Sequence, residues 1–197
     1  MKQRTVLERD AALNHLGIGY WPQGRPLNVT LVYHDDRTHA WAEELFERLT
    51  KAAGSDALRA TWWKISDLIE PGVLAGAVST AMRADVIVVA FDAAERLPVP
   101  AHVWVDTWLP NRPAATGCLV GLIGTSGHAN GELKSAREYL RAVAREGHLA
   151  LLLEERRLPV EPQPLPRRAI RFSRPNLHPV ELGTLVGAGS RVSHWAA

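Results

Sequence analysis

Cysteine is nearly absent from the sequence, and the single residue of this type, Cys118, lies within an apolar run. One cysteine cannot form an intramolecular disulfide, so nothing in the sequence indicates an oxidising compartment. Unpaired cysteines in such runs are usually buried and unreactive. We therefore expect Cys118 to be a small core residue.

A charge excess and long hydrophobic runs are missing as well. The 23 basic and 21 acidic residues leave a formal net charge of +2, which provides no overall field to attract nucleic acid or an anionic membrane. No stretch has the roughly 18 apolar residues that a membrane helix requires. The N-terminus carries charges where a signal peptide has an apolar core. We expect a cytoplasmic protein with no membrane segment and no clear nucleic-acid partner.

What the sequence does contain is a regular alternation of apolar segments and amphipathic stretches. Its 197 residues, 46% of them hydrophobic, suffice for one domain with a sizeable core. Aliphatic and β-branched segments predict strands, and apolar residues at helical spacing predict helices between them. The predicted strands are residues 29–33, 58–63, 86–91, 118–124 and 149–153, and the predicted helices lie near 41–53, 71–82, 98–109 and 130–146.

The order of these elements predicts a single sheet of parallel strands. Each connection is long enough to hold a helix, which places helices on both faces. The segment 86–91 is apolar throughout and is expected at the centre, beside 29–33, whereas the alternating segment 58–63 suits an edge. The expected fold class is α/β: a three-layer α/β/α, doubly wound, five-stranded parallel sheet in the order 2-1-3-4-5, the flavodoxin-like arrangement.

The chain is expected to have three parts. Residues 1–27 form an N-terminal helix and arm, because Thr5 and Glu8 have capping-box spacing before a Gly- and Pro-rich stretch. Residues 28–155 form the flavodoxin-like domain. Residues 156–197 form a Pro- and Arg-rich tail without a sustained period, for which we expect extended structure or packing on the body or on a second subunit.

In such a sheet a ligand crevice lies beyond the carboxyl ends of the strands, where the winding direction reverses. Three predicted loops converge there: residues 34–39, 92–97 and 125–130.

The segment 84–109 resembles the corresponding stretch of flavodoxin-like NADPH-dependent FMN reductases and quinone reductases. In that family an apolar strand after Ala-Asp is followed by a loop, a helix start with proline, and an Asp near a Trp. The matching residues are Ala84, Asp85, Pro98 or Pro100, Asp106 and Trp108. The segment GLIGTSGHANG, after the fourth strand, is similar to the Gly-rich flavin loop of the same family.

The resemblance implies an FMN-dependent oxidoreductase in which hydride passes from a nicotinamide nucleotide through the flavin to a quinone-like acceptor. The flavin would carry the chemistry. The resemblance also implies a homodimer. The residues it assigns to the cofactor are Arg37, Thr38, His39, Asp92, Thr125, Ser126, Gly127 and His128.

Two departures from the family pattern lead to a rival hypothesis. Arg37 and Thr38 suit a phosphate at a helix start, but two carboxylates, Asp35 and Asp36, repel it unless they turn away. The second loop reads Phe-Asp-Ala where the family typically has Pro-x-Tyr-Asn. The alternative is therefore a non-catalytic binding or scaffold module of the same fold without bound flavin.

The acidic first loop also permits two further interpretations. Asp35, Asp36, Asp92 and Thr125 resemble the Mg²⁺ and phosphorylation site of a response-regulator receiver, although Glu154 and Glu155 stand where receivers have a lysine.

The other interpretation is a metal site at His34, Asp36 and His39, with or without Asp92. The simpler alternative is that these polar residues cap the next helix.

The tryptophans have a structural explanation. Trp41, Trp104 and Trp108 lie on apolar helix faces and are expected to fill the core or a subunit interface. Trp62 and Trp63 are adjacent in a predicted strand, so they are expected on opposite faces of the sheet.

Overall fold

The computed structural model describes residues 25–93, 96–113, 117–125 and 130–158. The predicted N-terminal helix and the tail beyond Leu158 lie outside this part of the chain. The helices and strands are β1 (Leu27–Tyr33), α2 (Asp36–Ala53), β2 (Leu58–Lys64), α3 (Pro71–Arg83), β3 (Val86–Asp92), α4 (Val99–Trp108), β4 (Cys118–Thr125), α5 (Asn130–Glu146) and β5 (Ala150–Arg157), with short 3-10 turns at Ser55–Ala57, Ile65–Ile69 and Leu109–Asn111.

The five strands form one parallel sheet in the order β2-β1-β3-β4-β5. Val29 of β1 is paired with Val86 of β3, and Tyr33 with Ala90. All seven residues of β3 are buried, because strands flank it on both sides and helices cover both faces. The predicted fold class, strand order and central position of this strand are confirmed.

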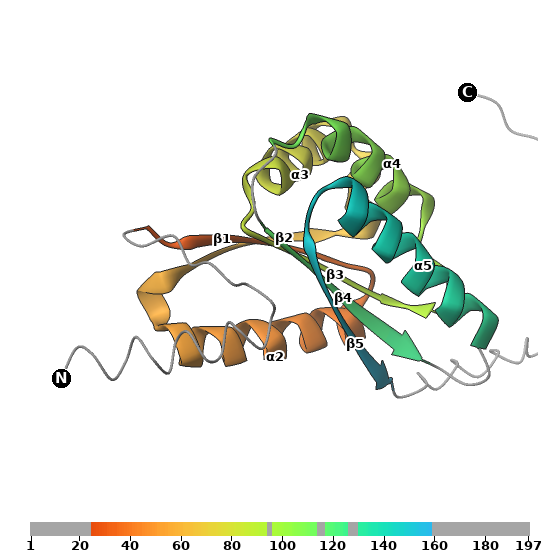
Figure 1. Ribbon diagram of the computed structural model, residues 1–197, viewed down its shortest axis with the longest axis horizontal. Coiled ribbons are helices and arrows are strands. Elements are labelled where there is room, and N and C mark those ends of the chain that lie inside the picture. The colour runs from red at the N-terminus through yellow and green to blue at the C-terminus, as the bar shows by residue number, and fades with distance from the viewer. Residues whose placement is uncertain (1–24, 94–95, 114–116, 126–129, 159–197) are drawn as a thin grey trace, which may run out of the picture. The chain divides into compact units, whose positions relative to one another are not determined.

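The helices form a layer on each face of the sheet (Figure 1). α2 lies on one face, and α3, α4 and α5 lie together on the other. Each helix turns an apolar stripe toward the sheet. The residues of α2 that pack on the sheet include Trp41, Leu45 and Leu49, and on the other face Trp104 and Trp108 of α4 are fully buried. Trp41, Trp104 and Trp108 therefore fill the core, as predicted.

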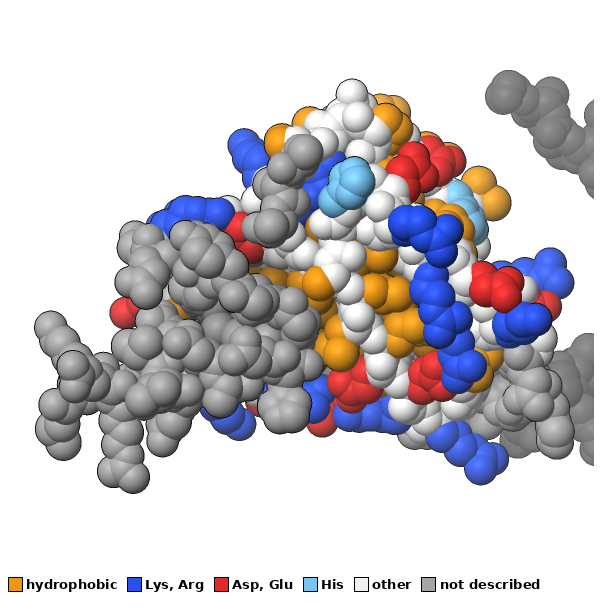
Figure 2. All heavy atoms as spheres, viewed as in Figure 1, with side chains coloured by type: hydrophobic (Ala, Val, Ile, Leu, Met, Phe, Trp, Pro, Cys, Tyr) orange, Lys and Arg blue, Asp and Glu red, His pale blue; other side chains and the backbone are white. Residues whose placement is uncertain are grey.

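The two edge strands meet solvent differently. β2 is the predicted edge, and its neighbouring Trp62 and Trp63 pack half-buried against opposite faces of the sheet. β5 is the other edge and continues to Arg157, so Arg156 and Arg157, which we expected in the tail, belong to the sheet. Figure 2 shows acidic and basic side chains gathered around the end of this strand. Such charges discourage another chain from pairing with an exposed edge.

Arg112 follows the turn after α4 and links it to the end of α3. Its guanidinium donates hydrogen bonds of 2.8 Å to the carbonyl oxygens of Ala81 and Ala84, which end the helix. It also lies 5.9 Å from the centre of the Trp108 ring. Burial lowers the pKa of this guanidinium.

Among the helices of the described residues, none combines the length and the apolar character that a membrane crossing requires.

Candidate functional site

The connection between β1 and α2 is the first loop of the predicted crevice, and it is very short. Only His34 and Asp35 lie between the end of the strand and the start of the helix. The His34 N–H donates to the carbonyl of Ala90 at 3.0 Å, which extends the pairing of β1 with β3. The helix therefore begins directly above the sheet edge, and no extended phosphate-binding loop separates the two elements.

Asp35 caps this helix with its own carboxylate. One carboxylate oxygen accepts hydrogen bonds from the Thr38 N–H at 2.9 Å and from the Thr38 hydroxyl at 2.8 Å. In return the Thr38 hydroxyl oxygen accepts the Asp35 N–H at 2.9 Å, which completes a capping box. Thr38 is fully buried. The proposal that polar residues after β1 cap the next helix is thus confirmed.

The second carboxylate oxygen of Asp35 forms an ion pair with Arg37. The guanidinium approaches it at 2.8 Å through Nε and at 2.7 Å through a terminal nitrogen. Burial alone would raise the pKa of Asp35, but hydrogen bonds from Thr38 and Arg37 outweigh it and hold that pKa below its ordinary value. Asp35 is therefore a carboxylate at neutral pH.

Arg37 also reaches toward the end of β3. Its other terminal nitrogen lies 4.0 Å from a carboxylate oxygen of Asp92, whose side chain is 0% exposed. The structure therefore brings two of the predicted cofactor residues together, Arg37 and Asp92, in a charged cluster with Asp35.

This helix start does not fit the phosphate of a flavin. A phosphate at a helix N-terminus needs free N–H groups and hydroxyls, and here the Thr38 amide and hydroxyl already bind an internal carboxylate. A phosphate oxygen about 4 Å from Asp35 would be repelled by about 4 kcal/mol per unit charge at an effective dielectric constant of about 20. Arg37 is paired with the same carboxylate at 2.7 Å, so the net repulsion is smaller than this figure, but the Arg37 charge that would attract a phosphate is already neutralised within the protein.

The other predicted cofactor residues lie elsewhere or outside the described part of the chain. The His39 ring packs 4.4 Å from the Tyr33 ring and 5.0 Å from that of Trp62, toward β2. The Thr125 hydroxyl donates to the carbonyl of Arg156 at 3.4 Å. Ser126, Gly127 and His128 are not among the described residues.

The metal and receiver hypotheses find no support at this edge. Within the described ranges, no group of three or more His, Cys, Asp or Glu side chains could hold a metal ion. Asp36 is exposed, while Asp35 serves the helix cap. Glu154 and Glu155 lie within β5, where their carboxylates accept hydrogen bonds from side chains of α2 and α5.

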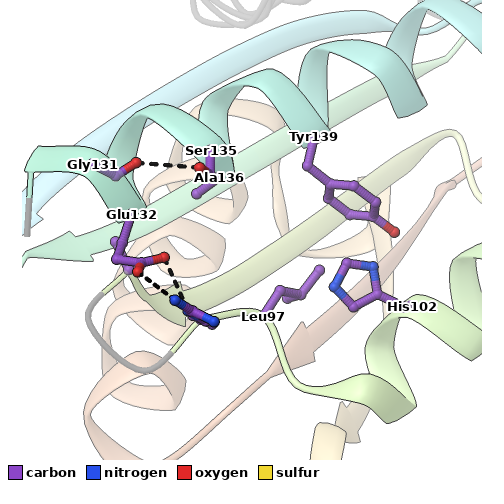
Figure 3. A pocket seen from close by; sticks show the side chains of 9 residues that line it. Leu97, His102, Gly131, Glu132, Ser135, Ala136 and Tyr139 are labelled. Atoms are coloured by element: carbon purple, nitrogen blue, oxygen red, sulfur yellow. Dashed lines mark hydrogen bonds and ion pairs between the residues drawn. The ribbon is translucent and has the colours of Figure 1, made fainter.

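A pocket of about 560 Å³ lies farther along the same edge, between α4 and α5. This volume is within the range of small-molecule sites. Figure 3 shows Tyr139 reaching from α5 toward His102 of α4, with Leu97 beside it. The residues that line the pocket are Ala93, Arg96, Leu97, His102, Gly131, Glu132, Ser135, Ala136 and Tyr139.

The two ends of this α4–α5 pocket differ in chemistry. At one end the rings of His102 and Tyr139 meet edge to face, with their centres 4.6 Å apart. At the other end Arg96 forms a two-pronged ion pair with Glu132, at 2.9 Å and 3.1 Å. Arg96 adopts a backbone φ of 57°, which is uncommon for a residue other than glycine.

The α4–α5 pocket was not found from the sequence. Ala136 belongs to the apolar stripe that predicts the buried face of α5, and it does pack against the core. Its small size leaves space beside Leu97, but the period of the stripe carries no information about such a gap. His102 and Tyr139 are distant in the sequence and meet only because α4 and α5 are neighbours.

The comparisons with known proteins do not assign the chain to a family. No family model matches the sequence, and no curated protein matches it significantly. A solved structure of a Trp repressor binding protein from Bacillus subtilis is similar at 9% identity and a TM-score of 0.46, over 66% of this chain and 86% of that one. A metal-soaked Flv1 flavodiiron core from Synechocystis sp. PCC6803 is similar at 17% identity and a TM-score of 0.44, over 76% of this chain and 34% of that one. By the order and direction of its own five strands, the chain has the flavodoxin-like fold.

Proposed function

We propose that this protein is a binding module of flavodoxin-like fold that works without flavin. The observation that carries the proposal is the carboxylate of Asp35 at the start of α2, hydrogen-bonded to Thr38 and Arg37. A negatively charged side chain of the protein thus stands at the helix start, where the phosphate of FMN would bind. The oxidoreductase hypothesis depends on that phosphate site, and so do its nicotinamide and quinone-like partners.

The other parts of the proposal are a location and an assembly. We propose the cytoplasm as its compartment and a homodimer as its assembly, which the resemblance to flavodoxin-like reductases suggests. Neither is needed for the argument from Asp35.

The test is a titration of the purified full-length protein with FMN, followed by flavin fluorescence and by calorimetry. We expect a colourless protein, no saturable quenching and no heat of binding up to millimolar FMN. Asp35→Ser keeps a neutral cap and removes the competing charge, so this variant should gain measurable affinity for FMN or for inorganic phosphate.

Asp36→Ser is the matched control, because it removes the same charge from the neighbouring, exposed position. It should gain no such affinity. A yellow protein as purified, or tight FMN binding by the unaltered chain that Arg37→Ala abolishes, would overturn the proposal and restore the flavoenzyme.

A further inference from the structure

The outer side of β2 is an open edge of the sheet. β2 pairs with β1 through seven consecutive residues, and no other strand of the described ranges pairs with it. Six of its seven residues are partly or fully exposed. α2 packs over β1, β3 and β4, and α3 over β1, so β2 lies at the border of both helix layers. Such an edge presents backbone N–H and C=O groups to which a further strand can bond.

The two edges of the sheet differ in their protection against such pairing. β5 ends in four successive charged residues. β2 reads LRATWWK, with no proline, glycine or acidic residue, and its unbroken register with β1 contains no bulge. Its two charges stand at the second and last positions, so the residues between Arg59 and Lys64 carry none. β2 is therefore the edge suited to pairing.

β2 is complementary to a second copy of itself. In an antiparallel pair related by a two-fold axis, facing residues lie on the same side of the sheet. An axis at Thr61 gives every residue of the strand a partner, and no like charges face each other. A shift by two residues in either direction leaves Arg59 or Trp63 outside the pairing. The facing pairs with the axis at Thr61 are Leu58–Lys64, Arg59–Trp63, Ala60–Trp62 and Thr61 with itself.

The pair of Arg59 and Trp63 adds a specific attraction. The Trp63 indole N–H donates to the Thr80 hydroxyl at 3.0 Å, and its ring lies so close to Gly76 that an added Cβ would be 2.9 Å away. The ring is thus held in place on the α3 side of the sheet. Arg59 is exposed and lies on the same side, so its guanidinium reaches the partner's Trp63 ring. The axis makes this cation–π contact twice.

The α2 side of the strand contributes apolar surface. The centre of the Trp62 ring lies 5.0 Å from that of His39, 6.0 Å from that of Phe46 and 6.5 Å from that of Tyr33. All four side chains are partly exposed. Pairing at Thr61 places the large Trp62 side chain opposite the small one of Ala60 and brings the two aromatic clusters together across the axis. Burial of this surface favours the dimer.

We infer that β2 of one protomer pairs antiparallel with β2 of its partner, centred on Thr61, and joins the two sheets into one. This inference rests on the homodimer of the proposed function and names its interface. The argument from Asp35 against a flavin phosphate does not depend on it.

The first measurement is sedimentation velocity of the full-length protein, in which we expect a dimer at micromolar concentration. Arg59→Ala removes both cation–π contacts and should weaken association roughly 5- to 30-fold. Arg157→Ala is the matched control, because it removes an exposed arginine from the other edge strand. It should associate as the unaltered chain does.

Thr61→Lys and Thr61→Glu test the position of the axis. Each variant places like charges opposite each other, with facing Cα atoms about 4.5–5.5 Å apart, and should stay monomeric where the unaltered chain dimerises. An equal mixture of the two places opposite charges there and should restore the dimer. Both variants lose the contact between the Thr61 and Thr30 hydroxyls, so the mixture separates the effect of charge from that loss. Circular dichroism shows that each variant is folded.

Thr61→Cys tests the same contact covalently. Facing Cα atoms at this separation are within the range of a disulfide, so mild oxidation should link the two protomers. The native cysteine, Cys118, is buried and does not compete. Arg157→Cys is the control and should not link them.

A protein that is monomeric at every concentration refutes the inference and the homodimer together, and leaves this edge to a strand of another protein. A dimer that the Thr61 charge variants leave intact and that Thr61→Cys does not link refutes this interface alone. The titration with FMN is a separate result: FMN binding by a dimer that is linked through Thr61→Cys refutes the flavin-free module and supports the β2 interface.

Discussion

Replacing Asp35 by alanine tests whether the start of α2 depends on an internal carboxylate. The change removes both hydrogen bonds from Thr38 and both contacts from Arg37. Loss of an N-cap typically costs about 0.5–2 kcal/mol. Because the Thr38 side chain is buried and its amide loses a charged partner, we expect the upper end, about 2 kcal/mol. For a chain of this length that lowers the melting temperature by roughly 4–8 °C.

The measurement is urea unfolding followed by tryptophan fluorescence, with thermal unfolding alongside. Asp36→Ala is the control, since it makes the same charge change one residue later on an exposed side chain. The exposed Asp36 carboxylate lies at the start of the helix, where the helix dipole favours it, so its replacement should lower the free energy of unfolding by less than about 1 kcal/mol. Equal destabilisation by the two variants would refute the capping argument.

The pH dependence gives a second check on the same residue. The pKa of Asp35 is lower in the folded protein than its ordinary value of 3.8, so folding favours the ionised form. That contribution is complete above the ordinary pKa and is lost as the pH falls through the folded one. The stability gap between the unaltered chain and Asp35→Ala should therefore be full at neutral pH and narrow in acid. A gap that stays constant from neutral pH into acid would show that the carboxylate charge plays no part.

Three other substitutions or reactions probe the packing around the sheet. Arg112→Lys should destabilise the fold by about 1–2 kcal/mol in thermal unfolding, because an ammonium cannot bond both carbonyls at the end of α3 as the planar guanidinium does; an unchanged midpoint contradicts this. Gly121→Ala should lower the free energy of unfolding in urea by about 1–3 kcal/mol, because the added Cβ would lie 2.5 Å from a methyl carbon of Leu140. Equal stability would show that α5 shifts to accommodate the methyl group. Burial raises the pKa of Cys118 to about 11, so its thiol should react with Ellman's reagent only after unfolding; rapid reaction of the native protein would place this residue at the surface.

The sheet could be predicted because its strands differ in ways that the sequence records. An apolar run such as Val86–Asp92 has no solvent-facing side, which assigns it to the middle of the sheet. The alternation around Trp62 and Trp63 assigns β2 to an edge. These patterns depend on each strand alone, and the strand order follows from combining them with the lengths of the connections.

The end of β5 could not be predicted in this way. Glu154, Glu155, Arg156 and Arg157 read as the start of a charged tail, yet they continue the edge strand. Their charges are accommodated because Arg156 pairs with Glu44 of α2, and the two glutamates meet arginines of α2 and α5. These partners are far away in the sequence, so hydropathy alone assigns the segment to solvent.

The candidate site could be predicted from the sequence only in part, for a related reason. The conflict between a phosphate and the acidic pair at residues 35 and 36 is evident from charge alone. Its resolution depends on which way Asp35 turns, and the structure turns it inward onto Thr38 while Asp36 faces solvent. The sequence contains no comparable sign of the α4–α5 pocket, because the pocket arises from the spacing of two helices and not from a local pattern.

In the flavodoxin-like topology, ligands are expected in the crevice between β1 and β3, where the winding of the sheet reverses. In this chain only two residues separate β1 from α2, and the Thr38 N–H at the helix start binds a carboxylate of the protein itself. The position that the topology offers to an anion is thereby used for stability. A pocket at the same carboxyl edge lies between α4 and α5, away from this helix start. A flavodoxin-like fold therefore does not by itself fix a phosphate site, because the side chain at the first helix start determines what that position can bind.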